Sequence, residues 1–180
     1  MIKIVAGIYR SRQIETPSSG TLPTKNFVRE ALFSSLGEKV KGARVLDLFA
    51  GSGALGIEAI SRGASFCHFV DASKESADVI RRNLKSLGIE NAEIRCMDYL
   101  DALKELKDER FDLVFLDPPY ANKEAYVKAV EALLASNRLQ SDGVLVLEYE
   151  GDLPPIPGEF AKKEKRYGKT KLLILRKETI

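Results

Sequence analysis

The stretch from Val45 to Ile60 constrains the fold of this chain more than any other. It reads VLDLFAGSGALGIEAI, an apolar run of β-forming residues followed by a glycine turn and a helical apolar pattern. The glycines of Gly51-Ser52-Gly53 permit positive φ angles and let a ligand approach the backbone where a Cβ would collide. Gly56 would let the helix lie close to the strand. A strand, a tight glycine turn and a helix in this order predict a nucleotide-binding unit.

The rest of the chain after residue 43 alternates between predicted strands and helices. The strands are expected at 66–70, 92–97, 111–116 and 143–148, and the helices at 74–87, 101–106 and 124–134. Two further strands, 160–167 and 172–177, would form a hairpin around Gly168. This order predicts an α/β fold whose mostly parallel, seven-stranded sheet is covered on both faces and ends in an antiparallel hairpin.

A small extension precedes this unit, and we place the boundary between residues 42 and 43. Residues 2–6 are expected to form a strand, followed by a second extended piece that would project Arg10 and Arg12 to one side. Thr24 is the expected N-cap of a helix that ends at Gly37. Its apolar stripe would contain Phe27, Val28, Ala31, Leu32 and Leu36, and Arg29 would lie off that stripe.

Length and composition exclude several classes of protein. With 180 residues, of which 44% are hydrophobic, the chain can form one medium domain with a sizeable core. No apolar run approaches the roughly 20 residues that span a bilayer, and the first residues do not read as a signal peptide. Cys67 and Cys96 lack metal-ligand spacing, and we expect both to be buried, reduced thiols. These features favour a cytosolic protein without a bound metal.

The charges are distributed unevenly along the chain. The net charge is +2, but residues 1–42 carry +4, residues 161–180 carry +6, and residues 43–160 therefore carry −8. Basic ends around an acidic centre are typical of a protein whose termini contact a polyanion, although solvated surface charges explain them equally well.

Four aspartates mark the edge of the predicted sheet. Asp47 lies within the first strand, whereas Asp71, Asp98 and Asp117 follow the next three strands. Because ligands of open α/β sheets bind at the carboxyl ends of the strands, the strand-end acids should surround one cleft. A dehydrogenase would explain Asp71 as a ribose ligand, but it would not explain Asp98, the motif that begins at Asp117, or the closing hairpin.

That motif, Asp117-Pro-Pro-Tyr120, together with the glycine turn, carries a resemblance to a known family. The chain resembles the S-adenosylmethionine-dependent methyltransferases of amino groups, and within them the bacterial 16S ribosomal RNA guanine-N2 methyltransferases of the RsmD type. The resemblance implies a Rossmann-like class I methyltransferase fold. It rests on the segments IVAGIYR (4–10), PT (23–24), VREALF (28–33), VLDLFAGSGALG (45–56), DPPY (117–120) and YG (167–168).

The chemistry of an exocyclic amine explains the motif. The lone pair of such a nitrogen is delocalised into the ring, so the pocket must draw it out of conjugation. The Asp117 carboxylate and a backbone carbonyl of Pro118 or Pro119 can each accept one N–H bond, and prolines suit this role because they donate no N–H and fix φ. Tyr120 would stack on the base. Positioning would supply most of the acceleration.

The resemblance also implies the cofactor contacts. Gly51, Ser52 and Gly53 would lie under the methionine and ribose parts of the cofactor, and Asp47 would meet its ammonium group. Asp71 would bind the ribose hydroxyls and Asp98 the adenine amino group. The complete expected set is Asp47, Gly51, Ser52, Gly53, Gly56, Asp71, Ala72, Met97, Asp98 and Tyr99.

The implied partner is 16S rRNA, in an assembled or partly assembled small ribosomal subunit. RNA contacts, mainly to phosphates, are expected from Arg10, Arg12, Lys25, Arg29, Tyr167 and Lys169. The chain departs from the family pattern at Leu22 and Phe27, where arginine is frequent, and at Ser11, where glycine is usual. We expect a monomer.

Three alternatives stay open at this point. A DNA adenine-N6 methyltransferase would hold its substrate amine with the same motif, but the chain lacks a sizeable DNA-recognition insertion. A protein glutamine methyltransferase usually has Asn in place of Asp117. A nucleotide-binding ribosome-assembly factor would have no catalytic activity.

His68, the one histidine, lies inside a predicted strand and is expected to be structural.

Overall fold

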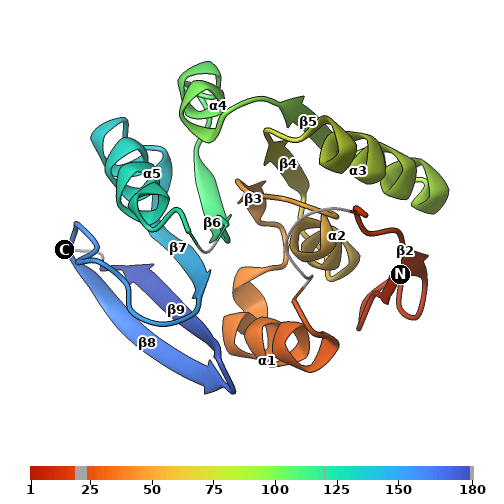
Figure 1. Ribbon diagram of the computed structural model, residues 1–180, viewed down its shortest axis with the longest axis horizontal. Coiled ribbons are helices and arrows are strands. Elements are labelled where there is room, and N and C mark those ends of the chain that lie inside the picture. The colour runs from red at the N-terminus through yellow and green to blue at the C-terminus, as the bar shows by residue number, and fades with distance from the viewer. Residues whose placement is uncertain (19–23, 120, 179–180) are drawn as a thin grey trace.

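A computed structural model of the chain shows a twisted seven-stranded sheet with helices on both faces (Figure 1). It describes residues 1–18, 24–119 and 121–178. The strand order is β5-β4-β3-β6-β7-β9-β8; the pairs from β5 to β7 are parallel, and β9 is antiparallel to both of its neighbours. The strands are β3 (Arg44–Asp47), β4 (Phe66–Asp71), β5 (Ala92–Cys96), β6 (Phe111–Leu116), β7 (Leu139–Tyr149), β8 (Phe160–Tyr167) and β9 (Thr170–Lys177). The predicted α/β class, the mostly parallel sheet and the closing hairpin are confirmed.

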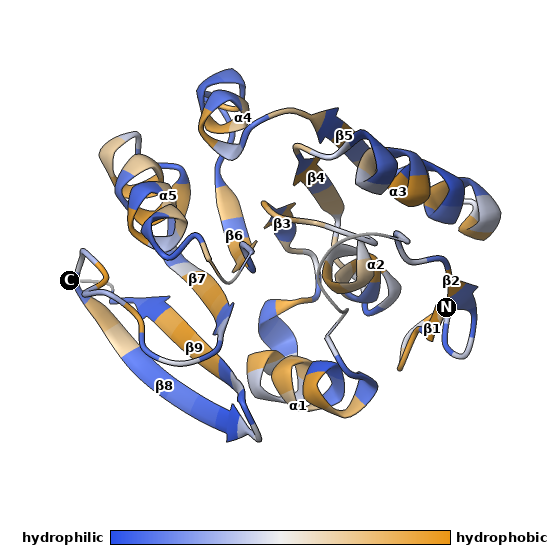
Figure 2. Ribbon diagram, in the orientation of Figure 1, coloured by the Kyte–Doolittle hydropathy of each residue, from blue (hydrophilic) through white to orange (hydrophobic). Residues whose placement is uncertain are grey.

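Five α-helices of the described chain form the two outer layers. They are α1 (Asn26–Leu36), α2 (Ala54–Ser61), α3 (Lys74–Leu87), α4 (Tyr99–Glu105) and α5 (Glu124–Ala135). The side chains of α1, α2 and α3 contribute to one apolar cluster, and those of α4 and α5 contribute to a second cluster. Figure 2 shows the central strands mostly hydrophobic and the edge strand β8 mostly hydrophilic. Charged residues on an edge strand discourage pairing with another sheet.

The topology fixes the place of a ligand site. From β3 the chain first builds outward through β4 and β5, and it then returns to the other side of β3 to form β6 and β7. The order therefore reverses between β3 and β6. In such sheets a crevice opens beyond the carboxyl ends of the two strands that flank the reversal.

Most element boundaries agree with the sequence predictions, and the differences have local causes. The predicted bounds of α3 and β6 are confirmed. Helix α4 begins earlier than predicted because Asp98 caps it, accepting a 2.9 Å hydrogen bond from the Leu100 N–H. The sequence pattern of α5 predicts that Tyr126, Val127, Val130 and Leu134 point inward. Tyr126 and Val130 are buried, but Val127 and Leu134 are only partly buried, and the other buried positions are Ala125, Ala129 and Leu133.

The N-terminal extended pieces are shorter than predicted. They form a two-stranded antiparallel sheet of β1 (Ile2–Lys3) and β2 (Gln13–Ile14). Residues 7–11 make a turn, so the prediction of an extended chain that projects Arg10 and Arg12 to one side is wrong. Ser11 has a φ angle of 68°, a conformation that favours glycine.

The start of α1 also differs from the prediction. Lys25, not Thr24, is the N-cap residue, and it makes no side-chain cap bond. Phe27 was placed on the apolar stripe but is 55% exposed. Arg29 was placed off the stripe but is fully buried. Gly37 ends the helix as predicted.

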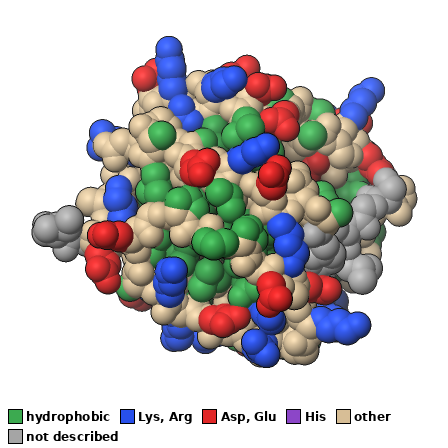
Figure 3. Space-filling model, turned by 60° about the vertical axis from the view of Figure 1, so that its left-hand side comes forward, with side chains coloured by type: hydrophobic (Ala, Val, Ile, Leu, Met, Phe, Trp, Pro, Cys, Tyr) green, Lys and Arg blue, Asp and Glu red, His purple; other side chains and the backbone are tan. Residues whose placement is uncertain are grey.

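The remaining predictions of this kind concern the cysteines and the surface. Both cysteines are free thiols, as predicted, but only Cys67 is buried; Cys96 is exposed. Within the described ranges, no helix is both long enough and apolar enough to cross a membrane. On the face that turns forward in Figure 3, acidic and basic side chains are interspersed around an apolar centre, so this face presents no continuous basic surface.

Candidate active site at the strand switch point

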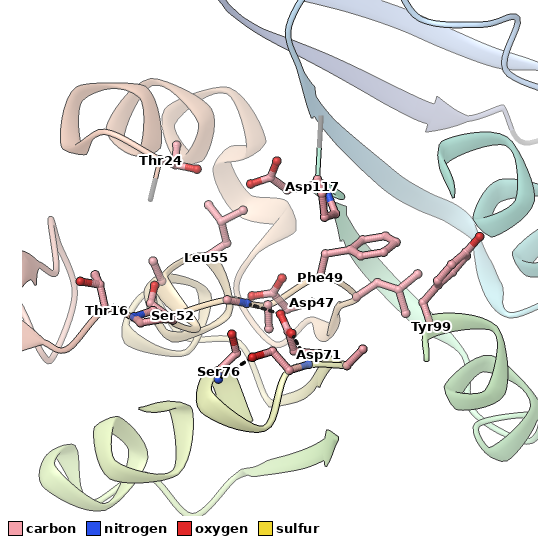
Figure 4. A pocket seen from close by; sticks show the side chains of 18 of the residues that line it. Thr16, Thr24, Asp47, Phe49, Ser52, Leu55, Asp71, Ser76, Tyr99 and Asp117 are labelled. Carbon is pink, nitrogen blue, oxygen red and sulfur yellow. Dashed lines mark hydrogen bonds between the residues drawn. The ribbon is translucent and has the colours of Figure 1, made fainter. Parts of the chain in front are cut away.

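A cavity of about 690 Å³ opens at the carboxyl ends of the central strands (Figure 4). This volume is typical of sites for small molecules and cofactors. The structure brings most of the predicted catalytic and cofactor-binding residues to this one cavity. The predicted residues that line it are Asp47, Gly51, Ser52, Asp71, Ala72, Met97, Asp98, Tyr99, Asp117 and Pro119.

The glycine turn forms the floor of the cavity. Gly51 and Gly53 have φ angles of 58° and 82°, which residues with side chains rarely adopt. Gly53 and Gly56 were predicted to contact the cofactor, but neither lines the cavity. An added Cβ at Gly56 would lie 2.4 Å from the Phe69 ring and 2.7 Å from the Cys67 sulfur. Gly56 therefore allows α2 to pack closely on β4, whereas the sequence predicted a close approach to the preceding strand, β3.

Asp71 holds the turn to the next helix. Its Oδ2 accepts a 2.8 Å hydrogen bond from the Gly51 N–H, and its Oδ1 accepts a 2.9 Å bond from the Ser73 N–H. Ser73 in turn caps α3, accepting from the Ser76 N–H. The carboxylate is thus fixed in position at the cavity wall, with lone pairs left for hydroxyl donors.

An aromatic pair stands at the far side of the cavity. Phe49 and Tyr99 have ring centroids 5.0 Å apart, and both line the cavity together with Met97. Asp98 is exposed and uses Oδ1 to cap α4. Burial raises the pKa of Tyr99, with a smaller effect from Asp98. The arrangement offers flat apolar surface beside one carboxylate, which suits a heteroaromatic ring that carries an amino group.

Asp47 lies deeper, at the end of β3. It is 2% exposed, and its Oδ2 accepts a 3.1 Å bond from the Gly56 N–H. Burial raises its pKa to about 7, against the opposing effect of that hydrogen bond; Asp71 and Glu148 raise it further. A cationic group placed beside Asp47 would favour its charged form.

Asp117 follows β6 and faces the same cavity. The residue is partly exposed to the cavity, and burial of its carboxyl raises the pKa of Asp117 well above the usual range, with Glu148 as the second cause. Pro119 is exposed and lines the cavity, whereas Pro118 is buried and does not line it. Tyr120 lies outside the described residues. The predicted substrate contacts of this motif therefore have a position for Asp117 and Pro119 only.

Sequence reasoning missed the group behind Asp117. Glu148, in β7, is 6% exposed and shares a hydrogen bond with the Asp117 carboxyl. Thr24 donates a 2.5 Å hydrogen bond to Glu148 Oε2. The sequence did contain a signal for this residue. An acid ends the apolar run 143–148, and that run forms the strand beside the one that precedes the Asp117 motif.

A second missed residue joins the N-terminal segment to the glycine turn. The Asn83 side chain accepts a 2.8 Å bond from the Glu15 N–H and donates 3.0 Å bonds to the carbonyls of Glu15 and Ser52. Thr16 and Pro17, which follow Glu15, line the cavity. The N-terminal segment thus forms one wall of the site. Asn83 gave no signal because an asparagine inside a helix pattern reads as surface.

The predicted RNA contacts divide into exposed and buried residues. Arg10, Lys25 and Lys169 are exposed; so is Arg12, whose side chain donates to the Ser86 carbonyl. Tyr167 is half-buried, with its ring edge against Phe27 at a centroid distance of 6.1 Å.

Arg29 does not face a ligand, so that prediction is wrong. Its guanidinium is buried and donates to the Lys3 carbonyl at 2.7 Å and to the Asn26 side chain. Burial lowers its pKa, and Glu58 partly opposes the effect. The residue fixes β1 to α1.

No metal site is found among residues 1–18, 24–119 and 121–178, where no three Cys, His, Asp or Glu side chains could together hold an ion. His68 is buried in β4, packs against Phe66 and Phe111, and does not line the cavity. Burial lowers its pKa, although Glu93 stands 3.1 Å away. A structural role for His68, as predicted, agrees with this position.

Comparison with known proteins gives consistent results. The model of a family described as conserved hypothetical protein 95 matches residues 2–176. Ribosomal RNA small subunit methyltransferase D of Haemophilus influenzae is 37% identical, over 88% of this chain and 83% of that protein. The solved structure of the yhhF protein from Escherichia coli superposes with a TM-score of 0.90 and 30% identity, over 99% of both chains. SMU.776, solved in complex with SAH, shares the fold with a TM-score of 0.66 at 17% identity, over 83% of this chain and 48% of that one.

Proposed function

This chain belongs to the family of conserved hypothetical protein 95, and on that premise we propose that it methylates the exocyclic N2 of a guanine in 16S rRNA, with S-adenosylmethionine as the methyl donor. Relatives named ribosomal RNA small subunit methyltransferase D support the reaction class and the substrate. The guanine, its N2 atom and the assembled subunit come from the sequence resemblance. The observation that carries the proposal is the position of Asp117, which faces the same cavity as the glycine turn.

The residues around the cavity fit the proposed cofactor. Asp71 presents a fixed carboxylate to ribose hydroxyls, and Asp47 would pair with the ammonium of the methionine part. Phe49, Met97 and Tyr99 form a flat apolar wall for the adenine, with Asp98 beside it for the amino group. When bound, S-adenosylmethionine supplies an electrophilic methyl group on a sulfonium sulfur.

The chain's own residues would hold and orient the amine. An Asp117 oxygen accepts one N–H of the substrate amine, and a carbonyl of the Pro118–Pro119 segment accepts the other. Both bonds favour a nitrogen whose lone pair points away from the ring. Thr16 and Pro17 line the same cavity and would help to exclude water once the amine is bound. Orientation and exclusion of water supply the rate enhancement, so no charged nucleophile is required.

Exposed basic residues would hold the RNA backbone. Arg10, Arg12, Lys25 and Lys169 lie on the N-terminal segment and the closing hairpin, where the sequence places its positive charge. The exposed ring of Phe27 beside Tyr167 adds an aromatic surface on which an unpaired base can stack. These contacts supply affinity rather than sequence reading.

The test is transfer of radiolabelled methyl groups to three substrates: unmodified small ribosomal subunits, naked 16S rRNA and duplex DNA. We expect label in the subunit or the rRNA, recovered as N2-methylguanine. Asp117→Ala should abolish transfer and leave RNA binding intact, and His68→Asn, away from the cavity, serves as the control. Label in DNA alone would show a DNA methyltransferase instead, and unchanged transfer by Asp117→Ala would remove Asp117 from the mechanism.

A further inference from the structure

We propose that Asp117 and Glu148 act as one acid pair that holds a single shared proton, and that this pair takes up the proton that the methylated amine must lose. Glu148 is a positioning residue in this proposal, because it reaches the substrate only through Asp117. The inference rests on the proposed function for the identity of the amine. The pair itself is a property of the protein alone and can be measured without any substrate.

The sheet places the two carboxyl groups side by side. Strands β6 and β7 are parallel, and Leu116 is in register with Leu147, so the residues that follow them are neighbours. Glu148 is almost fully buried, Asp117 is half-buried, and their side chains share a hydrogen bond. Two carboxyl groups that share a hydrogen bond cannot both ionise readily, so one proton stays between them at intermediate pH.

A hydroxyl group decides which of the two carries the proton. Thr24 donates its hydroxyl hydrogen to Glu148 Oε2, which favours the ionised form of Glu148. The Glu148 main chain is held as well, because the Tyr126 hydroxyl donates to its carbonyl. The shared proton therefore resides on Asp117, whose O–H donates to Glu148 and whose second oxygen remains free to accept an amine N–H.

The other charged groups around the pair are acids. Asp47 faces Asp117 from β3, and Glu150 acts on Glu148 from the end of β7. Across the described residues, neither carboxyl of the pair forms an ion pair with lysine or arginine. Burial and neighbouring negative charge both raise the pKa of each member of the pair. Both effects favour uptake of a second proton by the pair.

The proton balance of the reaction then closes on the chain's own residues. As the amine nitrogen forms its bond to the methyl carbon, the carbon–sulfur bond breaks and its electron pair stays on sulfur. The nitrogen is left with one proton too many. That proton passes to Asp117 as the proton of Asp117 passes to Glu148, so the pair goes from one proton to two. Release of one proton to water after product departure restores the starting state.

Titration of the free protein tests the pair directly. In protein labelled with ¹³C at its carboxyl groups, the Asp117 and Glu148 signals should move together in two steps, and Asp117→Asn would assign them. In Glu148→Gln, Asp117 should titrate in one step at lower pH, because its negative neighbour is gone. Glu131→Gln, on the exposed face of α5 and not among the groups that act on the pair, is the matched control and should leave the Asp117 titration unchanged. An Asp117 titration that is identical in Glu148→Gln and wild type would overturn the proposal.

Thr24 provides a second, independent variant. Thr24→Val removes the hydroxyl donor, so the pKa of Glu148 should rise and the pair should lose its single proton at higher pH. Thr24→Ser keeps the donor and should titrate like the wild-type protein. Equal titrations of the Val and Ser variants would show that the hydroxyl does not place the proton.

Kinetics then connects the pair to the reaction. In Glu148→Gln, single-turnover methyl transfer should fall on the order of tenfold or more, with the cofactor affinity unchanged, because the amine proton loses its final acceptor. The acid limb of the pH profile should move to lower pH, in parallel with the Asp117 titration. An absence of transfer by the wild-type protein would refute the proposed function and leave the pair standing. Transfer at an unchanged rate and pH profile in Glu148→Gln would refute the proton role alone.

Discussion

The Oδ2 atom of Asp71 accepts a 2.8 Å hydrogen bond from the backbone N–H of Gly51, across the gap between β4 and the turn that follows β3. Its Oδ1 accepts from the Ser73 N–H at 2.9 Å, at the start of α3. One side chain thus fixes both the glycine turn and the first turn of the next helix. The acid that is proposed to bind ribose also maintains the backbone on which the cofactor would rest.

Asp71→Asn should therefore weaken cofactor binding strongly. Asparagine has one acceptor oxygen, so its NH₂ group would face one of the two backbone donors. The variant also loses the charged acceptor for the ribose hydroxyls, and a hydrogen bond to a charged group contributes about 1.5–3 kcal/mol, which corresponds to a loss of roughly 10- to 100-fold in affinity. Calorimetric titration with S-adenosylhomocysteine measures this loss of affinity. Asp101→Asn, on the exposed side of α4, is the control, and equal affinity of the Asp71 variant and wild type would contradict the role of Asp71.

Gly56→Ala should destabilise the fold, although alanine is normally the better helix former. The added Cβ would lie 2.4 Å from the Phe69 ring and 2.7 Å from the Cys67 sulfur, so α2 would have to move away from β4. Overpacking of this kind costs about 1–3 kcal/mol. Urea unfolding gives the loss.

A second variant separates the packing effect from a backbone effect. Gly56→Ala combined with Phe69→Leu removes the nearest ring atoms, and the double variant should recover part of the lost stability. If the two substitutions are simply additive, the close approach of α2 to β4 is not what requires glycine.

The core fold was predictable because local pattern and burial agree there. The run 111–116 is apolar and bounded by polar residues, and it became β6 with the predicted limits. The helix at 74–87 has polar and apolar residues at helical spacing, a capping serine before it and Gly88 after it. In both segments the residues that favour the isolated strand or helix are also the residues that pack well in the folded domain.

The N-terminal segment was not predictable in the same way, because tertiary contacts decide its structure. Glu58 is fully buried and accepts from the N–H groups of Val5 and Ala6, more than fifty residues away in sequence. Ser61 accepts from the Tyr9 N–H and donates to the Ala6 carbonyl. These partners lie on α2, whose pattern reads only as a buried helix, and no periodicity in residues 1–16 reveals them.

The site shows the same division between sequence motif and tertiary contact. The strand-end position of Asp71 and Asp117 could be predicted, because each follows an apolar run. The link from Thr24 to Glu148 spans 124 residues and joins the N-terminal segment to β7. Thr24 looked like a helix cap, and its hydroxyl is used for an acid instead. Contacts between residues so far apart in the sequence depend on strand register and side-chain packing, which cannot be read from a single sequence.

Replacement of Arg29 should affect the stability of the fold, whereas replacement of Arg10 should affect RNA binding. Arg29→Met leaves the Lys3 carbonyl without its 2.7 Å donor, and we expect unfolding to become easier by about 1–3 kcal/mol. Its effect on the salt dependence of RNA binding should be nil, because the side chain is buried. Arg10→Met, at an exposed position, should change stability by no more than about 0.5 kcal/mol.

The salt dependence of RNA binding provides the readout for Arg10. Each phosphate contact that is lost should lower the slope of log K against log salt concentration by about 0.7–0.9. Filter binding at four salt concentrations, with wild-type and both variants, compares the slopes. A lower slope in Arg29→Met, or an unchanged slope in Arg10→Met, would reverse the assignment of the two residues.

Asp47 should make the stability of the protein fall as the pH rises toward neutrality. The pKa of Asp47 is about 7 in the folded chain, and we take its ordinary value of 3.8 for the unfolded chain. Between these two pH values the folded state therefore binds a proton that the unfolded state has released. The stabilisation that Asp47 contributes is complete below its pKa in the unfolded chain, and it is lost as the pH rises through its pKa in the folded chain. The slope is about 1.4 kcal/mol per pH unit for one group.

Asp47→Asn removes this titration and keeps the acceptor for the Gly56 N–H. The difference in unfolding free energy, variant minus wild type, should therefore increase between about pH 4 and pH 7 by as much as ~1.4 kcal/mol per unit. Urea unfolding at half-unit pH intervals measures the difference, in which the titrating groups that do not interact with Asp47 cancel. A difference that stays constant across this range would mean that Asp47 is ionised throughout. Its burial would then be compensated by solvent or by rearrangement of the floor of the cavity, and Asp47 could not serve as a group that gains its charge when a cationic ligand binds.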